Sequence, residues 1–254
     1  MDFVQELNTA NSSGRAFAVA VITAAEGTTP RHPGTKMIVY EDGTQAGTIG
    51  GGEIEQFVLA DTKNCMVSRK PLLKTYPVVQ SDGVRSGSET IYIEPSFPRS
   101  GLILCGAGHV AGKLIPLAKS IGFRITVIDI RDEAMIRERA AAADEFILAA
   151  SWAEGLARIP DNDDCYLIAC AFNFAQDEEI LYHLVHRKAA YIGMLASRYK
   201  RETIYNHLLE RGVAEEDLAR VHSPIGLSIG AETPEEIALS IAAELVKVRS
   251  DMQN

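Results

Sequence analysis

The 254-residue sequence has no excess of basic residues and no long apolar run. Its 25 Lys and Arg residues stand against 34 Asp and Glu residues, so the formal net charge is −9. This charge repels a phosphate backbone and an anionic membrane surface at long range, and no stretch approaches the roughly 18 apolar residues that span a bilayer. We therefore expect no nucleic-acid partner and no membrane partner. The first residues also lack the basic flank and apolar segment of a signal peptide, so we expect a cytoplasmic location.

Cysteine is scarce, and no two cysteines form a CxxC pair. The chain has four cysteines: Cys65, Cys105, Cys165 and Cys170. Their number and spacing give no sign of a disulfide framework or a zinc site, and they are interpreted as small core side chains. His183 and His186 lie three residues apart on a predicted helix, but no third ligand is near in the sequence, so we predict no metal site. Nucleophile elbow, kinase and HExxH motifs are absent, and catalytic residues stay unknown.

The first part of the chain predicts a small α+β domain. A helix opens the chain, residues 16–24 and 34–40 read as strands, residues 53–67 have helical spacing, and residues 90–94 alternate like a strand. The segment 95–101 contains two prolines and a glycine without periodicity, which suits a linker. We therefore predict an N-terminal domain over residues 1–95 and a second domain over residues 96–254.

The second part predicts a doubly wound α/β domain. Short apolar runs of the buried kind alternate with helical patterns, at residues 102–105, 124–128, 145–149, 165–171 and 191–195. Parallel strands need crossover connections that cover both faces of the sheet, so this alternation predicts a parallel sheet with helices on both sides. A capping pattern from Thr233 to Glu236 predicts a terminal helix. The fold class is therefore α/β, with a Rossmann-like parallel sheet and a smaller N-terminal α+β domain.

A glycine motif opens the second domain. Gly106 and Gly108 lie between an apolar strand and an amphipathic helix, with Ala111 in the third small position, so the loop amides can face a pyrophosphate. The next strand ends at Asp129, 129 − 106 = 23 residues after Gly106, where an acid can accept the hydrogen bonds of a ribose diol. Arg131 leaves a phosphorylated ribose open, although Asp129 would repel one, so an unphosphorylated ribose is favoured. The alternative is a structural turn without a ligand.

A second glycine-rich loop, Gly50-Gly51-Gly52, leads into the helix of the N-terminal domain. Its backbone can approach a ligand closely, and the helix start offers unpaired amides for an anionic group. Glu53 and Glu55 could equally cap that helix, so a binding role and a capping role stay open. Upstream, Arg31 can bind a phosphate or a carboxylate, with a solvated side chain as the alternative.

A third constellation lies where a predicted buried strand runs through Gly193 into a helix that begins near Ser197. Ligands of doubly wound sheets bind at the carboxyl ends of the strands, so Gly193, Ser197 and Arg198 could line a binding site. Arg198 and Lys200 could instead be ordinary surface charges.

Six segments, in their order and spacing, resemble the XdhC/CoxI family of xanthine dehydrogenase accessory proteins: GTTPRHPGTKMIV, GTIGGGEIE, LILCGAGHVAG, VIDIR, YIGMLASRYK and PIGLSIGAETPEEIALSI. The resemblance covers nearly the whole chain. In that family a small N-terminal domain is joined to a Rossmann domain, and members mature molybdenum hydroxylases. The resemblance implies an accessory factor that binds a molybdopterin-type molybdenum cofactor, with or without a nucleoside, and delivers it to a xanthine dehydrogenase-like apo-enzyme.

The resemblance also implies which residues hold the cofactor. In the N-terminal domain they are Thr29, Pro30, Arg31, Gly50, Gly51, Gly52 and Glu55. In the second domain they are Gly106, Gly108, His109, Asp129, Gly193, Ser197 and Arg198, to which the glycine motif adds Arg131. A molybdopterin carries a phosphate, or a pyrophosphate with a nucleoside, so glycine loops and Arg31 are suitable anchors.

The partners that the resemblance implies are a molybdenum hydroxylase apo-enzyme and a desulfurase that donates sulfur, and we expect a homodimer. A non-catalytic cofactor chaperone is favoured over an enzyme. One alternative is an NAD-dependent oxidoreductase acting on a small substrate, motivated by the glycine motif with Asp129 but without a clear proton donor. A further alternative is a nucleotide-responsive partner protein without chemistry.

The chain departs from the family pattern at four places. Many relatives have a cysteine at the position of Glu53, and another within the segment that reads Val84-Arg85-Ser86-Gly87 here. A soft thiolate suits molybdenum or sulfur transfer, and neither Glu nor Arg replaces it. Asn173 and Ser228 stand where the family often has His and Asp. We therefore expect a divergent member whose metal chemistry has changed or lapsed.

Overall fold

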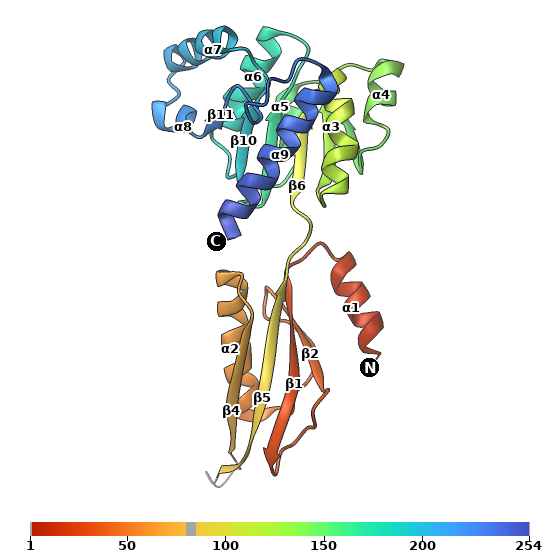
Figure 1. The fold of residues 1–254 in the computed structure, drawn as a ribbon, viewed down its shortest axis with the longest axis vertical. Helices are drawn as coiled ribbons and strands as arrows, with labels where there is room; N and C mark the ends of the chain where they lie inside the picture. Colours follow the sequence, from red (N-terminus) through yellow and green to blue (C-terminus); the bar gives the residue numbers. More distant parts are fainter. Residues whose placement is uncertain (1, 80–84, 254) are drawn as a thin grey trace. The chain divides into compact units, whose positions relative to one another are not determined.

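The computed structural model describes residues 2–79 and 85–253, and it contains two compact units, residues 1–98 and 99–254 (Figure 1). The predicted boundary between residues 95 and 96 lies at the end of strand β5 (Arg85–Ser96), shortly before the division between Pro98 and Arg99. None of the helices in the described ranges combines the length and the apolar run that crossing a bilayer requires.

The first unit is built on a five-stranded antiparallel sheet. Its described elements are α1 (Phe3–Ser12), β1 (Phe17–Gly27), β2 (Lys36–Tyr40), β3 (Gln45–Gly47), α2 (Gly52–Ser68), β4 (Leu72–Val79) and β5 (Arg85–Ser96). The strand order is β3-β2-β1-β5-β4, and every neighbouring pair is antiparallel. The prediction of a smaller α+β domain at the N-terminus is confirmed.

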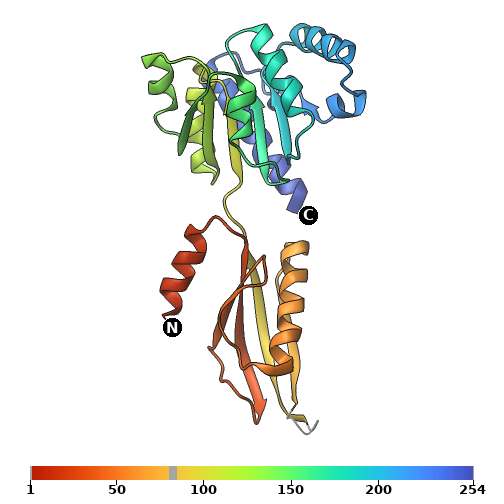
Figure 2. The same cartoon turned by 180° about the vertical axis from the view of Figure 1, so that it is seen from behind.

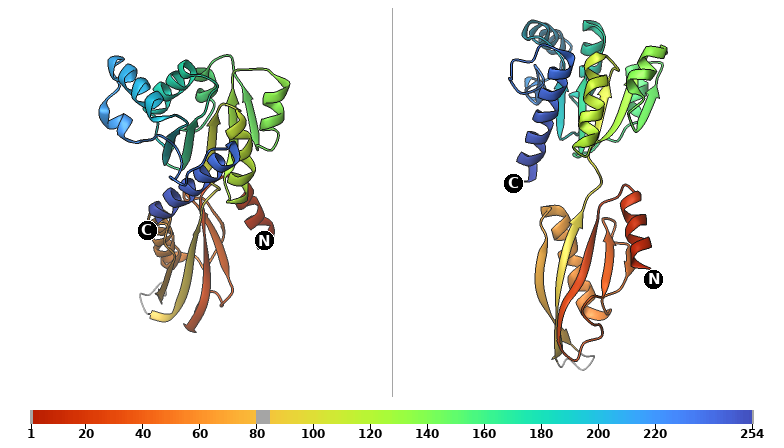
Figure 3. Two further views of the ribbon diagram at one scale, coloured as in Figure 1. Left: turned by 45° about the horizontal axis from the view of Figure 1, so that its top comes forward. Right: turned by 45° about the vertical axis from the view of Figure 1, so that its right-hand side comes forward.

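Helices α1 and α2 cover opposite faces of this sheet (Figure 3). Successive strand side chains point to opposite faces, and the apolar residues of β1 divide accordingly. Ala20 and Ile22 share one buried cluster with Val58 of α2, whereas Phe17 packs in another with Ala10 of α1. The alternation of β1 therefore gives the unit a two-sided core.

The second unit is a six-stranded parallel sheet wound with helices. Its described elements are β6 (Gly101–Cys105), α3 (His109–Ser120), β7 (Arg124–Asp129), α4 (Ala134–Ala140), β8 (Glu145–Leu148), α5 (Trp152–Ala157), β9 (Cys165–Ala169), α6 (Phe174–Leu184), β10 (Tyr191–Met194), α7 (Arg198–Glu210), α8 (Glu215–Ala219), β11 (Val221–His222) and α9 (Pro234–Gln253). The order β11-β10-β9-β6-β7-β8, with every pair parallel, is the order of a Rossmann domain. This confirms the predicted fold class.

Helices cover both faces of the parallel sheet (Figure 2), and a cluster of buried side chains lies on each face. Leu114 of α3 and Ile241 of α9 belong to one cluster, and Trp152 of α5, Leu181 of α6 and Ile204 of α7 belong to the other. Both faces of the strands are therefore covered, which explains why their sequences are continuous apolar runs rather than alternating ones.

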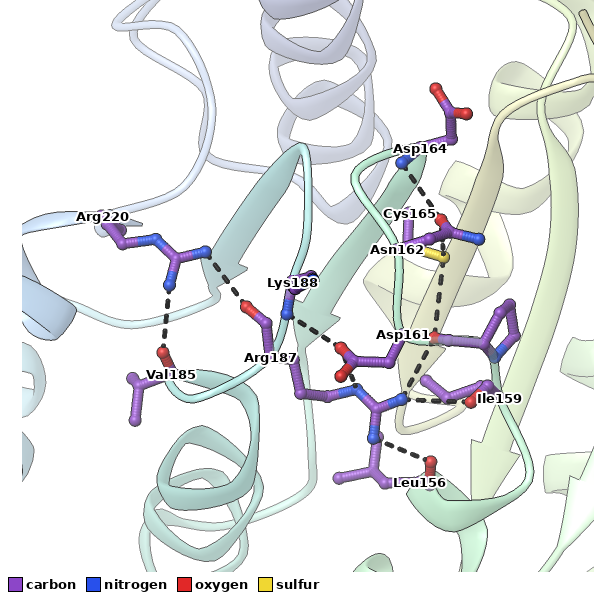
Figure 4. A network of polar contacts seen from close by, with 11 residues as sticks. Leu156, Ile159, Asp161, Asn162, Asp164, Cys165, Val185, Arg187, Lys188 and Arg220 are labelled. Carbon is purple, nitrogen blue, oxygen red and sulfur yellow. Dashed lines mark hydrogen bonds and ion pairs between the residues drawn. The ribbon is translucent and has the colours of Figure 1, made fainter.

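Arg187, in the loop before β10, forms hydrogen bonds to the segment that precedes β9 (Figure 4). Its guanidinium donates to the carbonyl oxygens of Leu156, Ile159 and Pro160, each at 3.1 Å. Asp161 lies 3.7 Å from its Nε and accepts from the Lys188 N–H at 2.8 Å. These contacts give the turn after α5 a fixed conformation at the amino ends of the strands.

Strands β3, β4 and β11 were not predicted, and each absence has a physical reason. Strands β3 and β11 are three and two residues long, too short to show alternation. Strand β4 contains Pro77, which argues against a strand because proline cannot donate to a ladder. At the sheet edge, where β4 lies, proline is tolerated.

Candidate functional site

The two halves of the parallel sheet meet between β6 and β9, which are neighbours in space. Strand β6 continues through α3 to β7 on one side, and β9 continues through α6 to β10 on the other. Ligands of doubly wound folds bind at such a switch point, beyond the carboxyl ends of the strands. The loops after β6 and β9, residues 106–108 and 170–173, therefore lie where a ligand of this fold would bind.

Gly106 and Gly108 have different physical roles in the β6–α3 loop. Gly106 has φ 116°, and a Cβ there would lie 2.4 Å from the carbonyl oxygen of Cys170. Gly108 has φ −74° and ψ −177°, and a Cβ there would meet only that oxygen, at 3.8 Å. Gly108 is also the N-cap of α3 and supplies no side-chain cap to its first-turn amides. The fold itself needs Gly106, whereas Gly108 leaves the helix start open to an anion.

The carboxylate of Asp129 is fully buried and already holds four hydrogen bonds. Its oxygens accept from the Ala107 N–H at 2.8 Å and from the Arg131 N–H, Nε and Nη2 at 3.0, 2.9 and 2.7 Å. Burial opposes ionisation, but these bonds, led by those from the Arg131 side chain, outweigh it and lower the pKa of Asp129. The ribose assignment stays a prediction. A diol that used Asp129 would have to replace Arg131 first.

Arg131 reaches from the end of β7 towards the loop after β9. Its guanidinium lies 4.3 Å from the ring centroid of Phe172, a side chain that is 46% exposed. At the start of α3, His109 Nε2 lies 2.7 Å from Nη2 of Arg139 on α4. Three basic side chains therefore come from the segments that surround the β6–α3 loop.

On the other side of the switch point, Asp177 and Lys200 form an ion pair. Asp177 is fully buried in the first turn of α6 and accepts from the Ala171 N–H at 2.8 Å, which fixes the loop after β9. Burial raises the pKa of Asp177, and the hydrogen bond from Lys200 only partly offsets it. Lys200 is thus no ordinary surface charge, whereas Arg198 is exposed and Ser197 caps α7 through the Lys200 N–H at 3.2 Å.

Gly193 lies inside strand β10, where it is buried. A Cβ there would approach Ile225 Cδ1 to 2.5 Å and the Tyr191 ring to 2.8 Å. Close packing against these two side chains accounts for the glycine without any ligand.

In the first unit, the two predicted ligand loops come together around a cavity of about 350 Å³. Its lining residues are Thr28, Thr29, Pro30, Gly50, Gly51, Gly52, Glu53, Ile54, Val78, Val79 and Ser86. Gly50, Gly51 and Gly52 all have positive φ, at 135°, 77° and 67°, a conformation that favours glycine. Arg31, predicted as an anion anchor, is not among the lining residues, and its side chain is exposed.

Glu55 holds the glycine loop of the first unit in shape. Its carboxylate accepts from Thr48 Oγ1 at 2.5 Å, Gln45 Nε2 at 2.8 Å and the Gly51 N–H at 3.0 Å. Burial opposes ionisation, but these hydrogen bonds lower the pKa of Glu55. Glu55 thus orders the loop before α2, whose start has no side-chain cap, and Glu53 is the acid that lines the cavity.

Comparison with known protein families settles the assignment of both units. A model of the XdhC Rossmann domain matches residues 102–245, and a model of the XdhC and CoxI family matches residues 10–77. The chain belongs to the XdhC and CoxI family. The resemblance drawn from the six sequence segments is confirmed.

Three relatives of this XdhC/CoxI chain are informative. The uncharacterized protein YqeB of Escherichia coli (strain K12) is 37% identical over 240 residues, 92% of this chain and 44% of that protein. A probable xanthine dehydrogenase subunit from Bacillus subtilis (strain 168) is 29% identical over 159 residues, 63% of this chain and 46% of that protein. The chain thus spans about half the length of these relatives. A crystal structure of a xanthine dehydrogenase from Bacillus halodurans shares the fold, with 23% identity, a TM-score of 0.53, and coverage of 99% of this chain and 96% of that one.

The donor groups of this XdhC/CoxI chain fit a phosphate better than a molybdenum ion. The uncapped start of α3 and the nearby Arg131 suit an oxyanion. All four cysteines are buried, and burial raises the pKa of Cys105 to about 12, so a thiolate is disfavoured there. Within residues 2–79 and 85–253, no three His, Cys, Asp or Glu side chains are grouped to hold a metal ion.

The departures from the XdhC/CoxI pattern have different structural contexts. Glu53 stands exposed in the first turn of α2 and lines the cavity. Val84, in the second departing segment, lies outside the described residues. Asn173 is the N-cap of α6 and accepts from the Gln176 N–H at 3.0 Å, and Ser228 is exposed after β11. Asn173 therefore has a structural role of its own.

Three residues near the candidate site were not predicted from the sequence: Phe172, Asp177 and Arg139. Asp177 had a usable signal, an acid in the first turn of a predicted helix directly after a buried strand. Phe172 and Arg139 had none, because their relevance depends on which loops the strand order brings together.

Proposed function

We propose that this protein is an accessory protein of a xanthine dehydrogenase-like molybdenum hydroxylase, which holds a molybdopterin-type cofactor by its phosphate end and delivers it to the apo-enzyme. The observation that carries the proposal is the uncapped start of α3 behind Gly108, at the switch point of the parallel sheet. Membership of the XdhC and CoxI family supports the partner, as does the name of the Bacillus subtilis relative.

The residues around the β6–α3 loop would bind and orient the cofactor. The first-turn amides of α3 donate to phosphate oxygens, and the helix dipole favours their negative charge. Arg131 adds charge-assisted donors, and Gly108 leaves room for the backbone to approach. Once delivered, the molybdenum centre supplies the redox chemistry of the hydroxylase.

The arrangement favours a carrier over a catalyst. Both fully buried carboxylates beside the switch point, Asp129 and Asp177, are held in ion pairs and bind backbone N–H groups. A general base must reach the proton that it removes, and neither carboxylate does so without breaking its pair. The same arrangement weighs against an NAD-dependent oxidoreductase, because the ribose of NAD would have to displace Arg131 from Asp129. A sulfur-donating desulfurase and a second copy of the chain are further partners that we propose from the family.

Cofactor retention tests the proposal. Molybdenum cofactor released from a purified hydroxylase would be mixed with the protein under anaerobic conditions, and the protein fraction from gel filtration would be analysed for molybdenum and for oxidised pterin fluorescence. We expect both to co-elute with the protein, and an excess of NAD to leave the retained amount unchanged. Retention of NAD without retention of pterin would overturn the proposal in favour of the oxidoreductase.

A further inference from the structure

The pairing of Arg131 with Asp129 changes which ligand groups the Rossmann site can bind. In a dinucleotide site, the acid at the end of the second strand accepts hydrogen bonds from a ribose diol. Here that acid is Asp129, and both of its oxygens accept from the Arg131 side chain, at 2.9 and 2.7 Å. The group presented at the ribose-reading position is therefore a donor rather than an acceptor.

The guanidinium is held in a defined plane. Two of its five N–H donors are directed to Asp129 in a bidentate pair. Its face lies 4.3 Å from the centroid of Phe172, which belongs to the loop after β9 and so comes from across β6. The guanidinium fork matches phosphate oxygens in geometry, and an arginine so fixed loses little further entropy on binding.

The accessibility of the charges around this position also favours an anion. The carboxylate of Asp129 is fully buried, whereas the Arg131 side chain is 20% exposed, so an approaching ligand meets the guanidinium first. The uncapped start of α3 adds a partial positive charge at the end of the β6–α3 loop. Asp129 is bound to this loop, because it accepts a hydrogen bond from the Ala107 N–H. Two negative charges oppose a ligand anion here, Asp129, which is paired with Arg131, and Glu133, which is exposed; both favour the cationic form of Arg131.

We propose that Arg131 is a specificity-determining residue that selects ligands with a phosphate monoester at the ribose-reading position over ligands with a free diol there. The inference rests on the proposed function in using the same β6–α3 site. Two sources provide this chemistry, the 2′-phosphate of a nucleotide and the terminal phosphate of a pterin without a nucleoside. It reverses the expectation of an unphosphorylated ribose, which rested on the repulsion of a phosphate by Asp129.

Calorimetric titration with matched nucleotides tests the proposal. NADP and NAD differ only by the 2′-phosphate, and 2′-AMP and 5′-AMP separate a 2′-phosphate from a terminal one. We expect the wild-type chain to bind NADP at least tenfold more tightly than NAD, and 2′-AMP more tightly than 5′-AMP, which keeps the free diol, because the charge-assisted contact with the Arg131 guanidinium is lost without a phosphate at this position. Arg131→Leu should remove that preference, and Arg131→Lys should keep part of it.

Glu133→Gln is a control variant for which the expected change in affinity is opposite to that of Arg131→Leu. Removal of the opposing charge should strengthen the binding of the phosphate-bearing probe, and the exposed position of Glu133 leaves the fold intact. Equal affinities for each matched pair, or a preference that survives in Arg131→Leu, would overturn the inference. If the protein retains the molybdenum cofactor but binds none of the nucleotides, the inference is overturned and the proposed function stands. A phosphate preference that depends on Arg131, without cofactor retention, supports the inference and overturns the proposed function.

Discussion

Replacement of Gly108 by aspartate should separate the stability of the Rossmann unit from its ability to bind an anion. Gly108 is the N-cap of α3, with φ −74° and ψ −177°, which an aspartate adopts without strain. A Cβ at this position would have its nearest contact with the Cys170 carbonyl oxygen, at 3.8 Å, which is ordinary van der Waals distance. The new carboxylate can therefore cap the first-turn amides, which lack a side-chain cap in the wild type.

The expected magnitudes have opposite signs. An aspartate cap in place of glycine, together with its interaction with the helix dipole, should stabilise the unit by about 0.5–1 kcal/mol. For a unit of this size, that corresponds to a rise in Tm of about 1–4 °C. A fixed negative charge about 4 Å from a bound phosphate costs about 4 kcal/mol at an effective dielectric constant of 20. After screening by salt, we expect binding to weaken on the order of a hundredfold.

Trp152 makes the stability measurement specific, because it is the single tryptophan of the chain and is buried in α5 of the second unit. Thermal unfolding of the full chain, followed by its fluorescence, reports on that unit alone. Cofactor retention is then measured on the same samples. Gly108→Ser is the matched control, since it caps the helix without adding a charge and should weaken binding much less. A Gly108→Asp protein that is stabilised and still retains the cofactor would refute the assignment of the phosphate to the start of α3.

Three further predictions concern the packing and polar contacts of the second unit. Gly106→Ala should cost about 3 kcal/mol or more in urea unfolding, because its Cβ would lie 2.4 Å from the Cys170 oxygen at φ 116°; a loss below about 1 kcal/mol would contradict the packing. Arg187→Leu should cost about 3 kcal/mol in the same assay, because it removes three hydrogen bonds from a charged donor to backbone carbonyl oxygens. Asp129→Asn should cost about 2–4 kcal/mol at neutral pH, because it breaks the buried pair with Arg131. Since the folded pKa of Asp129 is lowered, its stabilisation is complete above the unfolded value of about 3.9 and is lost as the pH falls through the folded value. The difference in the free energy of unfolding between wild type and Asp129→Asn should therefore shrink as the pH falls. A difference that does not change with pH down to about pH 2 would contradict the lowered pKa of Asp129.

Much of the second unit follows from local sequence patterns. Its strands are continuous apolar runs because helices cover both faces of the sheet, and this pattern is typical of parallel strands. The start of α9 was also predictable, since Thr233 and Glu236 form the reciprocal contacts of a capping box, at 3.3 and 3.0 Å. Both features depend on residues close together in the chain.

The details of the candidate site were less predictable because they depend on contacts between distant segments. The sequence placed Asp129 two residues before Arg131, but not the four hydrogen bonds that occupy its carboxylate. Phe172 meets Arg131 only because β9 lies beside β6 in the strand order. Lys200 was open to interpretation as a surface charge until α6 brought Asp177 against it.

Transfer of the cofactor to its enzyme tests the central claim most directly. The protein loaded with molybdenum cofactor would be mixed with a xanthine dehydrogenase-type apo-enzyme, in the presence of a scavenger that oxidises free cofactor, and hydroxylase activity would be followed over time. The account predicts that the loaded protein restores activity where the same amount of free cofactor does not, and that Gly108→Asp loses this advantage while remaining folded. Equal reconstitution by free cofactor and by the loaded protein would contradict it.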